Sequence, residues 1–198
     1  MTSFANVAEF SSSRSRLAAQ GTDFNETRAL VDAKGNVVAY AQTGGMINPT
    51  RHELGVGTII FRFGAGGAPV RAVSRGAWWV ERAEFEKLLA FANVHGLSIG
   101  LAVRILCLVP PEWSDLGLLI RARVMRPLLA YRGLGNNVII QKSDRLGDVA
   151  FPHQNEIAAR RLHQLYIAGL AAGADRALSI EQDWRFDPQA AMQGWLYL

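Results

Sequence analysis

The chain has a single cysteine, Cys107, so an internal disulfide bond and a zinc site built from cysteines are both excluded. No apolar run reaches the roughly 18 residues that a membrane span needs. Arg104 interrupts the longest candidate, residues 97–110. The N-terminus has no apolar core of the kind that a secretory signal peptide carries. The sequence therefore predicts a soluble domain, with Cys107 as a small buried core residue.

Motifs for nucleotide phosphates and for metals are missing as well. The glycine-rich stretch 64–67 follows a predicted strand, but Pro69 stands where the dinucleotide fingerprint requires a small residue. This stretch therefore predicts a flexible turn. The four histidines lack a metal-binding spacing, and the acidic residues form no calcium loop. We therefore expect no metal site.

Lysine is scarce, because only three of the 21 basic residues are lysines and the rest are arginines spread along the chain. The net charge of +4 and a pI of about 9.6 permit attraction to an anionic partner without demanding one. The sequence contains no dense basic tract of the kind that is typical of a nucleic-acid-binding arm. A nucleic acid is therefore a permitted partner that composition alone does not require.

The 198 residues fit one domain. Residues 1–25 include a serine- and arginine-rich stretch that is a poor core former, which predicts a flexible leader. A targeting role for this leader is an open alternative. Residues 26–198 carry the apolar patterns of a single globular domain.

Apolar periodicity predicts one main helix within 76–96, where Phe85, Leu88, Leu89 and Ala92 form one stripe. Residues 158–170 fit a helix or a strand, and alternation at 162–167 favours the strand. Strands are predicted at 58–63, 99–109, 118–124 and 127–131, a hairpin at 28–42, an exposed loop at 141–153 and a docked tail at 184–198. Because strands and helices do not alternate regularly, the sequence predicts an α+β fold. Its mainly antiparallel or split mixed sheet has one main amphipathic helix packed on it.

Arg62 is the first residue that can carry chemistry. It interrupts the strand 58–63 and alternates to the face opposite its bulky apolar neighbours. If that face lines a cleft, the guanidinium can hold a phosphate through paired hydrogen bonds. If the face meets water, Arg62 is an ordinary solvated strand residue.

Two further features can serve a site. Trp78 and Trp79 are adjacent and point in different directions, so one of them can stack on a flat ring such as nicotinamide or a base. The alternative is a hydrophobic anchor for the helix start. Glu156 can stabilise the positive charge of a ribosyl oxocarbenium ion, with Gln154 orienting an acceptor. Its alternative is a glutamate in the first turn of a helix.

In this order, Arg62, Ser74, and Gln154 with Glu156 resemble the Arg…Ser…Gln/Glu-x-Glu layout of the ADP-ribosyltransferase-like family, over residues 58–168. The resemblance implies that Arg62 binds NAD, that Ser74 supports the nicotinamide pocket, and that Glu156 is catalytic beside Gln154. It also implies a split pair of small mixed sheets.

The function implied by this resemblance is NAD-dependent ADP-ribosyl transfer to a macromolecule, or NAD cleavage. The protein would be a delivered effector or toxin that acts in the cytoplasm, its own or another cell's. The alternative is a basic binding protein without catalytic activity. Arg121, Arg123 and the five tryptophans would then bind a nucleic acid, or an exposed strand edge would bind a protein partner, including a second copy of the chain.

Overall fold

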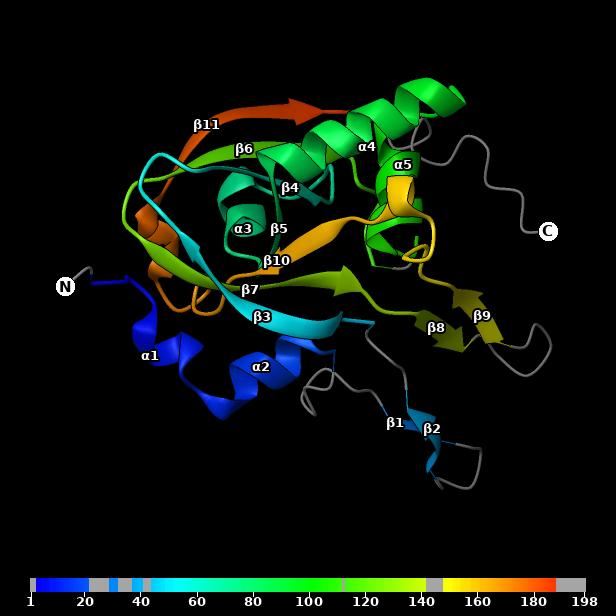
Figure 1. The fold of residues 1–198 in the computed structure, drawn as a ribbon, viewed down its shortest axis with the longest axis horizontal. Helices are drawn as coiled ribbons and strands as arrows, with labels where there is room; N and C mark the ends of the chain where they lie inside the picture. The colour runs from blue at the N-terminus through cyan, green and yellow to red at the C-terminus, as the bar shows by residue number, and fades with distance from the viewer. Residues whose placement is uncertain are drawn as a thin grey trace.

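A seven-stranded antiparallel sheet forms the centre of the molecule, in the order β11-β6-β4-β5-β10-β7-β3 (Figure 1). The computed structural model describes residues 3–21, 29–31, 37–40, 44–111, 113–141 and 148–187. The predicted α+β class with a mainly antiparallel sheet is confirmed. The strands of this sheet are β3 (Met46–Leu54), β4 (Ile59–Gly64), β5 (Trp78–Glu81), β6 (Leu118–Val124), β7 (Leu128–Gly135), β10 (His163–Tyr166) and β11 (Leu178–Arg185).

Two separate hairpins lie outside this sheet. β1 (Ala29–Val31) pairs with β2 (Val37–Tyr40), which confirms the hairpin predicted within 28–42. β8 (Val138–Gln141) pairs with β9 (Asp148–Phe151). The loop predicted at 141–153 therefore contains a strand, which the polar residues around it concealed. Of the tail predicted to dock at 184–198, Trp184 and Arg185 belong to β11, and residues 188–198 lie outside the described part.

The main predicted helix is α4 (Arg82–His95), and α5 (Ile99–Cys107) follows it after a sharp bend. The strand predicted at 99–109 is wrong. A continuous apolar run fits a buried helix as well as a buried strand, and Ser98 starts the helix by accepting a 3.2 Å hydrogen bond from the N–H of Leu101. In the described part of the chain, no single helix is long and apolar enough to cross a membrane. Together α4 and α5 pass by length and composition, but they are bent by 115°.

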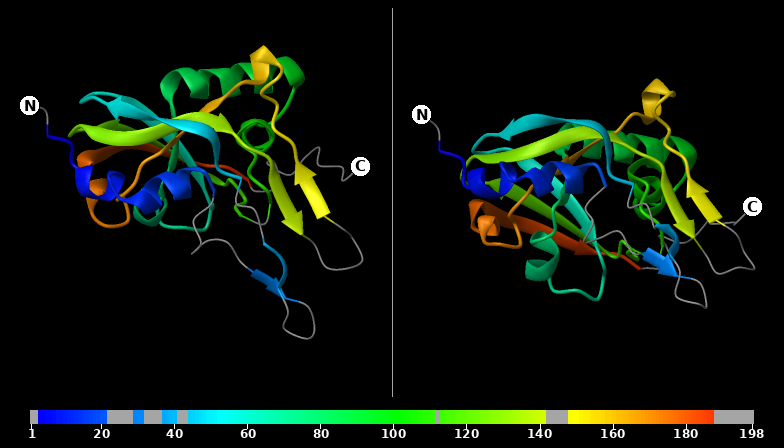
Figure 2. Two further views of the ribbon diagram at one scale, coloured as in Figure 1. Left: turned by 60° about the horizontal axis from the view of Figure 1, so that its bottom comes forward. Right: turned by 90° about the horizontal axis from the view of Figure 1, so that it is seen from below.

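Alternation along the strands divides the apolar side chains between two cores. Ile60 and Trp79 point into a core that also receives Leu54 of β3 and Ile120 of β6, from opposite ends of the sheet. Their neighbours point into a second core, which α4 and α5 cover. The short helix α3 (Val70–Ser74) and the 3-10 helix η2 (Ala174–Ala177) close the first core. Figure 2 shows α4 and α3 on opposite sides of the sheet.

Residues 3–21 pack against the sheet. They form α1 (Val7–Phe10) and α2 (Ser13–Ala19), which lie along β7 and β3 (Figure 1). The amide of Asn6 is fully buried and exchanges hydrogen bonds of 2.8 Å with the backbone of Leu129, and its Nδ2 also donates to the carbonyl of Ala168. The rest of the leader predicted at 1–25 lies outside the described residues.

Candidate functional site

Arg62 lies on β4, and its guanidinium reaches the turn that joins α3 to β5. Nη1 donates a 2.5 Å hydrogen bond to the carbonyl oxygen of Trp78. Gly76 permits this approach, because a Cβ added there would lie 1.9 Å from Nη2 of Arg62. The guanidinium therefore occupies the space that any side chain at position 76 would need.

The charge of Arg62 has no counter-charge. Among the described residues, no carboxylate forms an ion pair with it, and its Nε is buried without a hydrogen-bond partner. Burial lowers the pKa of Arg62 to about 10, so the group remains a cation at neutral pH. A withdrawn cation with unused hydrogen-bonding capacity contributes little to folding, but it is well prepared to bind an anion. The face of β4 that carries Arg62 is therefore not a solvated face.

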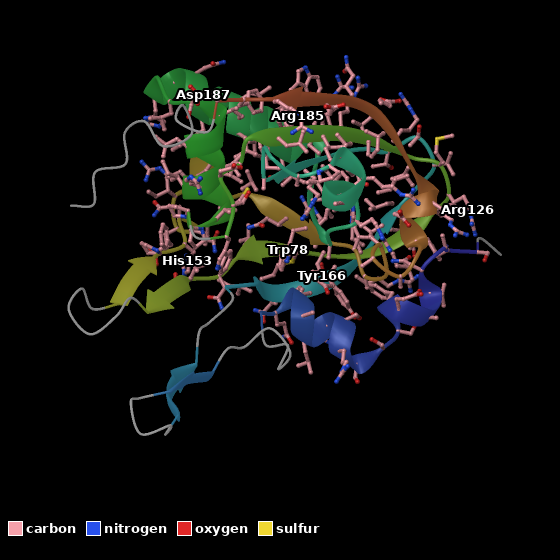
Figure 3. The ribbon with its side chains drawn as sticks, turned by 180° about the vertical axis from the view of Figure 1, so that it is seen from behind. Trp78, Arg126, His153, Tyr166, Arg185 and Asp187 are labelled. Atoms are coloured by element: carbon pink, nitrogen blue, oxygen red, sulfur yellow. The ribbon has the colours of Figure 1, made fainter. Side chains whose placement is uncertain are left out.

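An aromatic surface lies beside Arg62. Trp78 of β5 pairs across the strands with Tyr166 of β10, and their rings meet edge to face with centroids 5.3 Å apart. Both side chains are half-buried, and Figure 3 shows them close together at the centre of one side of the molecule. Tyr131 of β7 continues the row, and Phe10 of α1 stacks on it at 4.4 Å. The N-terminal helix thus covers one end of the row, and at the other end Arg62 contacts the backbone carbonyl of Trp78.

Gln164 is a site residue that the sequence reasoning missed. It precedes Tyr166 by two positions on β10, so the two side chains share a face of the sheet. Gln164 is only 8% exposed, and its Nε2 donates a 3.2 Å hydrogen bond to the carbonyl of Cys107. This hydrogen bond does not use the Oε1 atom of Gln164. The available signal was a carboxamide inside an apolar alternation, where a polar side chain needs a reason to be buried.

Ser74 is the last residue of α3, and its hydroxyl forms a hydrogen bond within that helix. It is buried in α3, and its Oγ donates a 3.0 Å hydrogen bond to the carbonyl of Arg71. This contact is local and typical of a serine in a helix. Ser74 and Arg62 form no hydrogen bond with each other among the contacts of the described residues.

Gln154 and Glu156 lie in the loop between β9 and the 3-10 helix η1 (Ala158–Arg160). Glu156 is exposed, and Oε1 of Gln154 accepts a 2.9 Å hydrogen bond from Arg160. Figure 3 shows His153, in the same loop, well away from Trp78 and Tyr166. No contact between this pair and Arg62 is among the contacts of the described residues, and the shared cleft stays a prediction.

The same loop does reach the Gln164 end of the site. Nδ2 of Asn155 donates a 2.8 Å hydrogen bond to the carbonyl of Gly135. A Cβ added to Gly135 would lie 3.1 Å from Nε2 of Gln164. Residues 153–156 thus border the site at its far end, so the catalytic role of Glu156 stays a prediction.

A second polar cluster lies at the other end of β5, around Glu81. This carboxylate accepts a 3.0 Å contact from Nε2 of His52 on β3 and a 3.2 Å hydrogen bond from Nε of Arg132 on β7. A pocket of about 350 Å³ adjoins the cluster. Its lining comprises Gly57, Thr58, Ile59, Glu81, Arg82, Ala83, Glu84 and Arg132.

Glu84 is the buried member of this cluster. It lies in the first turn of α4 and accepts hydrogen bonds from Nη2 of Arg132 and Nζ of Lys87, both at 2.9 Å, and from the backbone N–H of His163 at 3.1 Å. Burial raises the pKa of Glu84, but these hydrogen bonds and the charges of Lys87 and His163 outweigh it, so the pKa is lowered overall. The contacts join α4 to β7 and β10, which is a structural role.

The arginine face predicted on β6 is partly neutralised. Arg121 and Arg123 both form ion pairs with Glu181 of β11, so two cations share one carboxylate. The ion pairs weaken the attraction of these arginines for an outside anion. Nucleic-acid binding by this pair stays a prediction.

Comparisons with known proteins gave no family and one distant structural similarity. No protein-family model matches the sequence, and no curated protein matches it. Among solved structures, the chain is similar to Rhs1-CT, which was solved in complex with its cognate immunity protein RhsI1. The TM-score is 0.41 at 15% sequence identity, and the match covers 73% of this chain and 86% of that chain.

Proposed function

We propose that this protein binds NAD at the site formed by Arg62, Trp78, Tyr166 and Gln164, and that it cleaves the bond between nicotinamide and ribose. The ADP-ribose then passes to a macromolecule or to water. The observation that carries the proposal is the guanidinium of Arg62, a largely buried cation with no carboxylate partner among the described residues. It is hydrogen-bonded to the backbone of Trp78, whose half-buried ring pairs with Tyr166.

Each part of NAD has a chemically suitable partner in this arrangement. The pyrophosphate suits Arg62, because a guanidinium binds phosphate oxygens through two parallel hydrogen bonds. The flat nicotinamide ring suits the Trp78–Tyr166 surface, which offers area for stacking. Nicotinamide leaves as a neutral molecule with the electron pair of the broken bond, so positive charge develops on the ribose.

A preorganised dipole in a water-poor place can stabilise that charge. Gln164 supplies such a dipole, because its Nε2 is held by the carbonyl of Cys107 and its Oε1 is the atom left to face the ribose. Glu156 carries a full negative charge but is exposed, where water screens it. We therefore assign the main stabilising role to Gln164 and a lesser one to Glu156.

An enzyme that consumes NAD harms the cell that contains it. This is a chemical reason to extend the proposal to an effector or toxin delivered into another cell, where NAD is abundant. A protein that covers the Trp78–Tyr166 surface would then be the natural way to protect the producing cell.

The proposal is tested by incubating the purified protein with NAD and measuring nicotinamide release by chromatography. We expect release by the wild type and a loss of about 100-fold or more for Gln164→Ala, as for the removal of one preorganised dipole that stabilises the transition state. Glu156→Gln should lose less than Gln164→Ala. Ser74→Ala is expected to retain most activity, because its hydroxyl is bonded within α3.

A matched control separates chemistry from folding. Gln182 is an exposed glutamine on β11, so Gln182→Ala makes the same chemical change away from the site and should leave nicotinamide release unaltered. No release from the wild type, at any NAD concentration and with cell extract added as a source of acceptor, would overturn the proposal.

A further inference from the structure

Five exposed arginines lie in one strip next to the proposed site. Here this group is called the arginine strip, and its members come from the turn after β6, from η2, from the two ends of α3 and from β11. They are Arg71, Arg75, Arg126, Arg176 and Arg185. Figure 3 shows Arg126 and Arg185 on the same side of the molecule as Trp78.

Backbone contacts show that the strip is continuous. The N–H groups of Met125 and Arg126 both donate to the carbonyl of Ala177, the residue after Arg176. Arg75 donates to the carbonyl of Ala171 and lies 3.9 Å from Asp175, so it ties the end of α3 to η2. Arg185 donates to the carbonyls of Gly66 and Ala68, just before α3. The strip therefore runs from the β6–β7 turn, across η2 and α3, to the end of β11.

The positive charge of the strip is largely uncompensated. Among the described contacts, Asp175 is the acidic side chain paired with a member of the strip, and the 3.9 Å separation makes that pair weak. Arg71, Arg126 and Arg176 form no ion pair with a described carboxylate. Two exposed arginines outside the strip are paired, since Arg51 pairs with Glu53 and Arg82 with Glu86.

A row of unpaired arginines suits a regularly spaced polyanion better than a single small anion. Guanidinium groups along a surface can follow a phosphate backbone, and a nearby aromatic ring can stack on an unpaired base. Trp78 lies three residues after Arg75 in the chain, and its side chain is half-buried. A base has to be free of pairing to stack in this way, which favours a single strand over a duplex.

We propose that the arginine strip binds the backbone of a single-stranded nucleic acid, and that this polymer is the acceptor of ADP-ribose. The acceptor part rests on the proposed function, whereas binding by the strip does not. In the transfer, the bond from ribose C1′ to the nicotinamide nitrogen breaks. A new bond forms from C1′ to a nucleophilic oxygen or nitrogen of the polymer, which gives its proton to water.

Binding is tested without NAD, by fluorescence anisotropy with a labelled 16-nucleotide single strand, as RNA and as DNA, and with the matching duplex. We expect the single strands to bind more tightly than the duplex, with an affinity that falls steeply as salt rises. Arg126→Gln with Arg176→Gln should weaken binding at least about 5-fold and reduce the salt slope by about 1.4, since each phosphate contact on a single strand accounts for about 0.7.

The double variant Arg51→Gln with Arg82→Gln removes the same charge from exposed arginines outside the strip. It should keep the wild-type affinity within about 2-fold and the wild-type slope. Equal losses in the two double variants, or equally tight binding of the base-free polyanion heparin, would overturn a nucleic-acid surface at the strip. Capture of an acidic protein with no binding of either single strand would overturn it as well.

The acceptor part is tested with NAD labelled in its adenylate phosphate. Label that moves to the oligonucleotide, and that is reduced by the Arg126→Gln, Arg176→Gln variant without loss of nicotinamide release, supports it. Nicotinamide release with no labelled oligonucleotide overturns the acceptor and leaves NAD cleavage standing. Oligonucleotide binding without any nicotinamide release overturns the proposed function and leaves the strip as a binding surface.

Discussion

Nη1 of Arg62 lies 2.5 Å from the carbonyl oxygen of Trp78, which fixes a cation to the strand that carries this half-buried aromatic ring. Neither residue gains much stability from this arrangement, since a backbone carbonyl offers a partial charge where a carboxylate would offer a whole one. A protein tends to keep such a costly group where a ligand uses it. Replacing Arg62 should therefore affect function much more than stability.

Replacing Arg62 by methionine should abolish nicotinamide release while leaving the fold at least as stable. Methionine retains the apolar stem and removes a desolvated charge, and such replacements are often neutral or stabilising. We expect the free energy of unfolding in urea to fall by no more than about 1 kcal/mol, or to rise. Nicotinamide release should drop by about 100-fold or more. Parallel losses of stability and activity would show that Arg62 is only a structural residue.

A second prediction concerns Gly76, whose missing side chain makes room for Arg62. In Gly76→Ala the new Cβ would lie 1.9 Å from Nη2, so the guanidinium must leave the carbonyl of Trp78. The KM for NAD should rise, at a stability cost of about 1–3 kcal/mol. Gly67→Ala is the matched control, because nothing lies within 4 Å of a Cβ there. A Gly76→Ala protein with an unchanged KM would place the binding of the pyrophosphate somewhere else.

Sequence reasoning predicted one part of the proposed site and did not predict Gln164. The alternation around Phe61 and Arg62 was enough to place the arginine on the face opposite its neighbours, since strand periodicity is a local property. The sequence could not predict the buried position of Gln164, because its hydrogen bond to the carbonyl of Cys107 depends on the helix α5. The sequence predicts a strand for the run from Ile99, because periodicity cannot distinguish a buried helix from a buried strand. The helix at α5 and the position of Gln164 depend on contacts between segments that are distant in the sequence, which local periodicity does not contain.

The third prediction is that acid destabilises the fold through His163 and Glu84. Burial, together with the charge of Arg132, lowers the pKa of His163 below its usual 6.5. Such a group stabilises the fold above its unfolded pKa, and this contribution is lost as the pH falls through the folded pKa. The lowered pKa of Glu84 has the same sign, with its usual value at 4.5.

Unfolding in urea should therefore show falling midpoints from about pH 6.5 downward, first from His163 and then, below pH 4.5, from Glu84. Glu84→Gln should be much less stable than the wild type at pH 7, and the difference should shrink as the pH is lowered to 4. Glu86→Gln, at an exposed partner of Arg82 in the same helix, should differ little from the wild type at any pH. A difference for Glu84→Gln that does not depend on pH would contradict the assignment.

The last prediction concerns the thiol of Cys107, on the helix that supports Gln164. Burial, helped by the negative charge of Glu84, raises the pKa of Cys107 to about 12. Only the thiolate reacts with iodoacetamide, so alkylation at pH 8 should be slower than for a free thiol by orders of magnitude. Because the backbone carbonyl of Cys107 accepts a hydrogen bond from Gln164, loosening of α5 should expose both residues at once. Saturating NAD should slow the residual alkylation further in the wild type but not in Arg62→Met. Rapid alkylation of the folded wild type would show that α5 opens readily and cannot hold Gln164 in place.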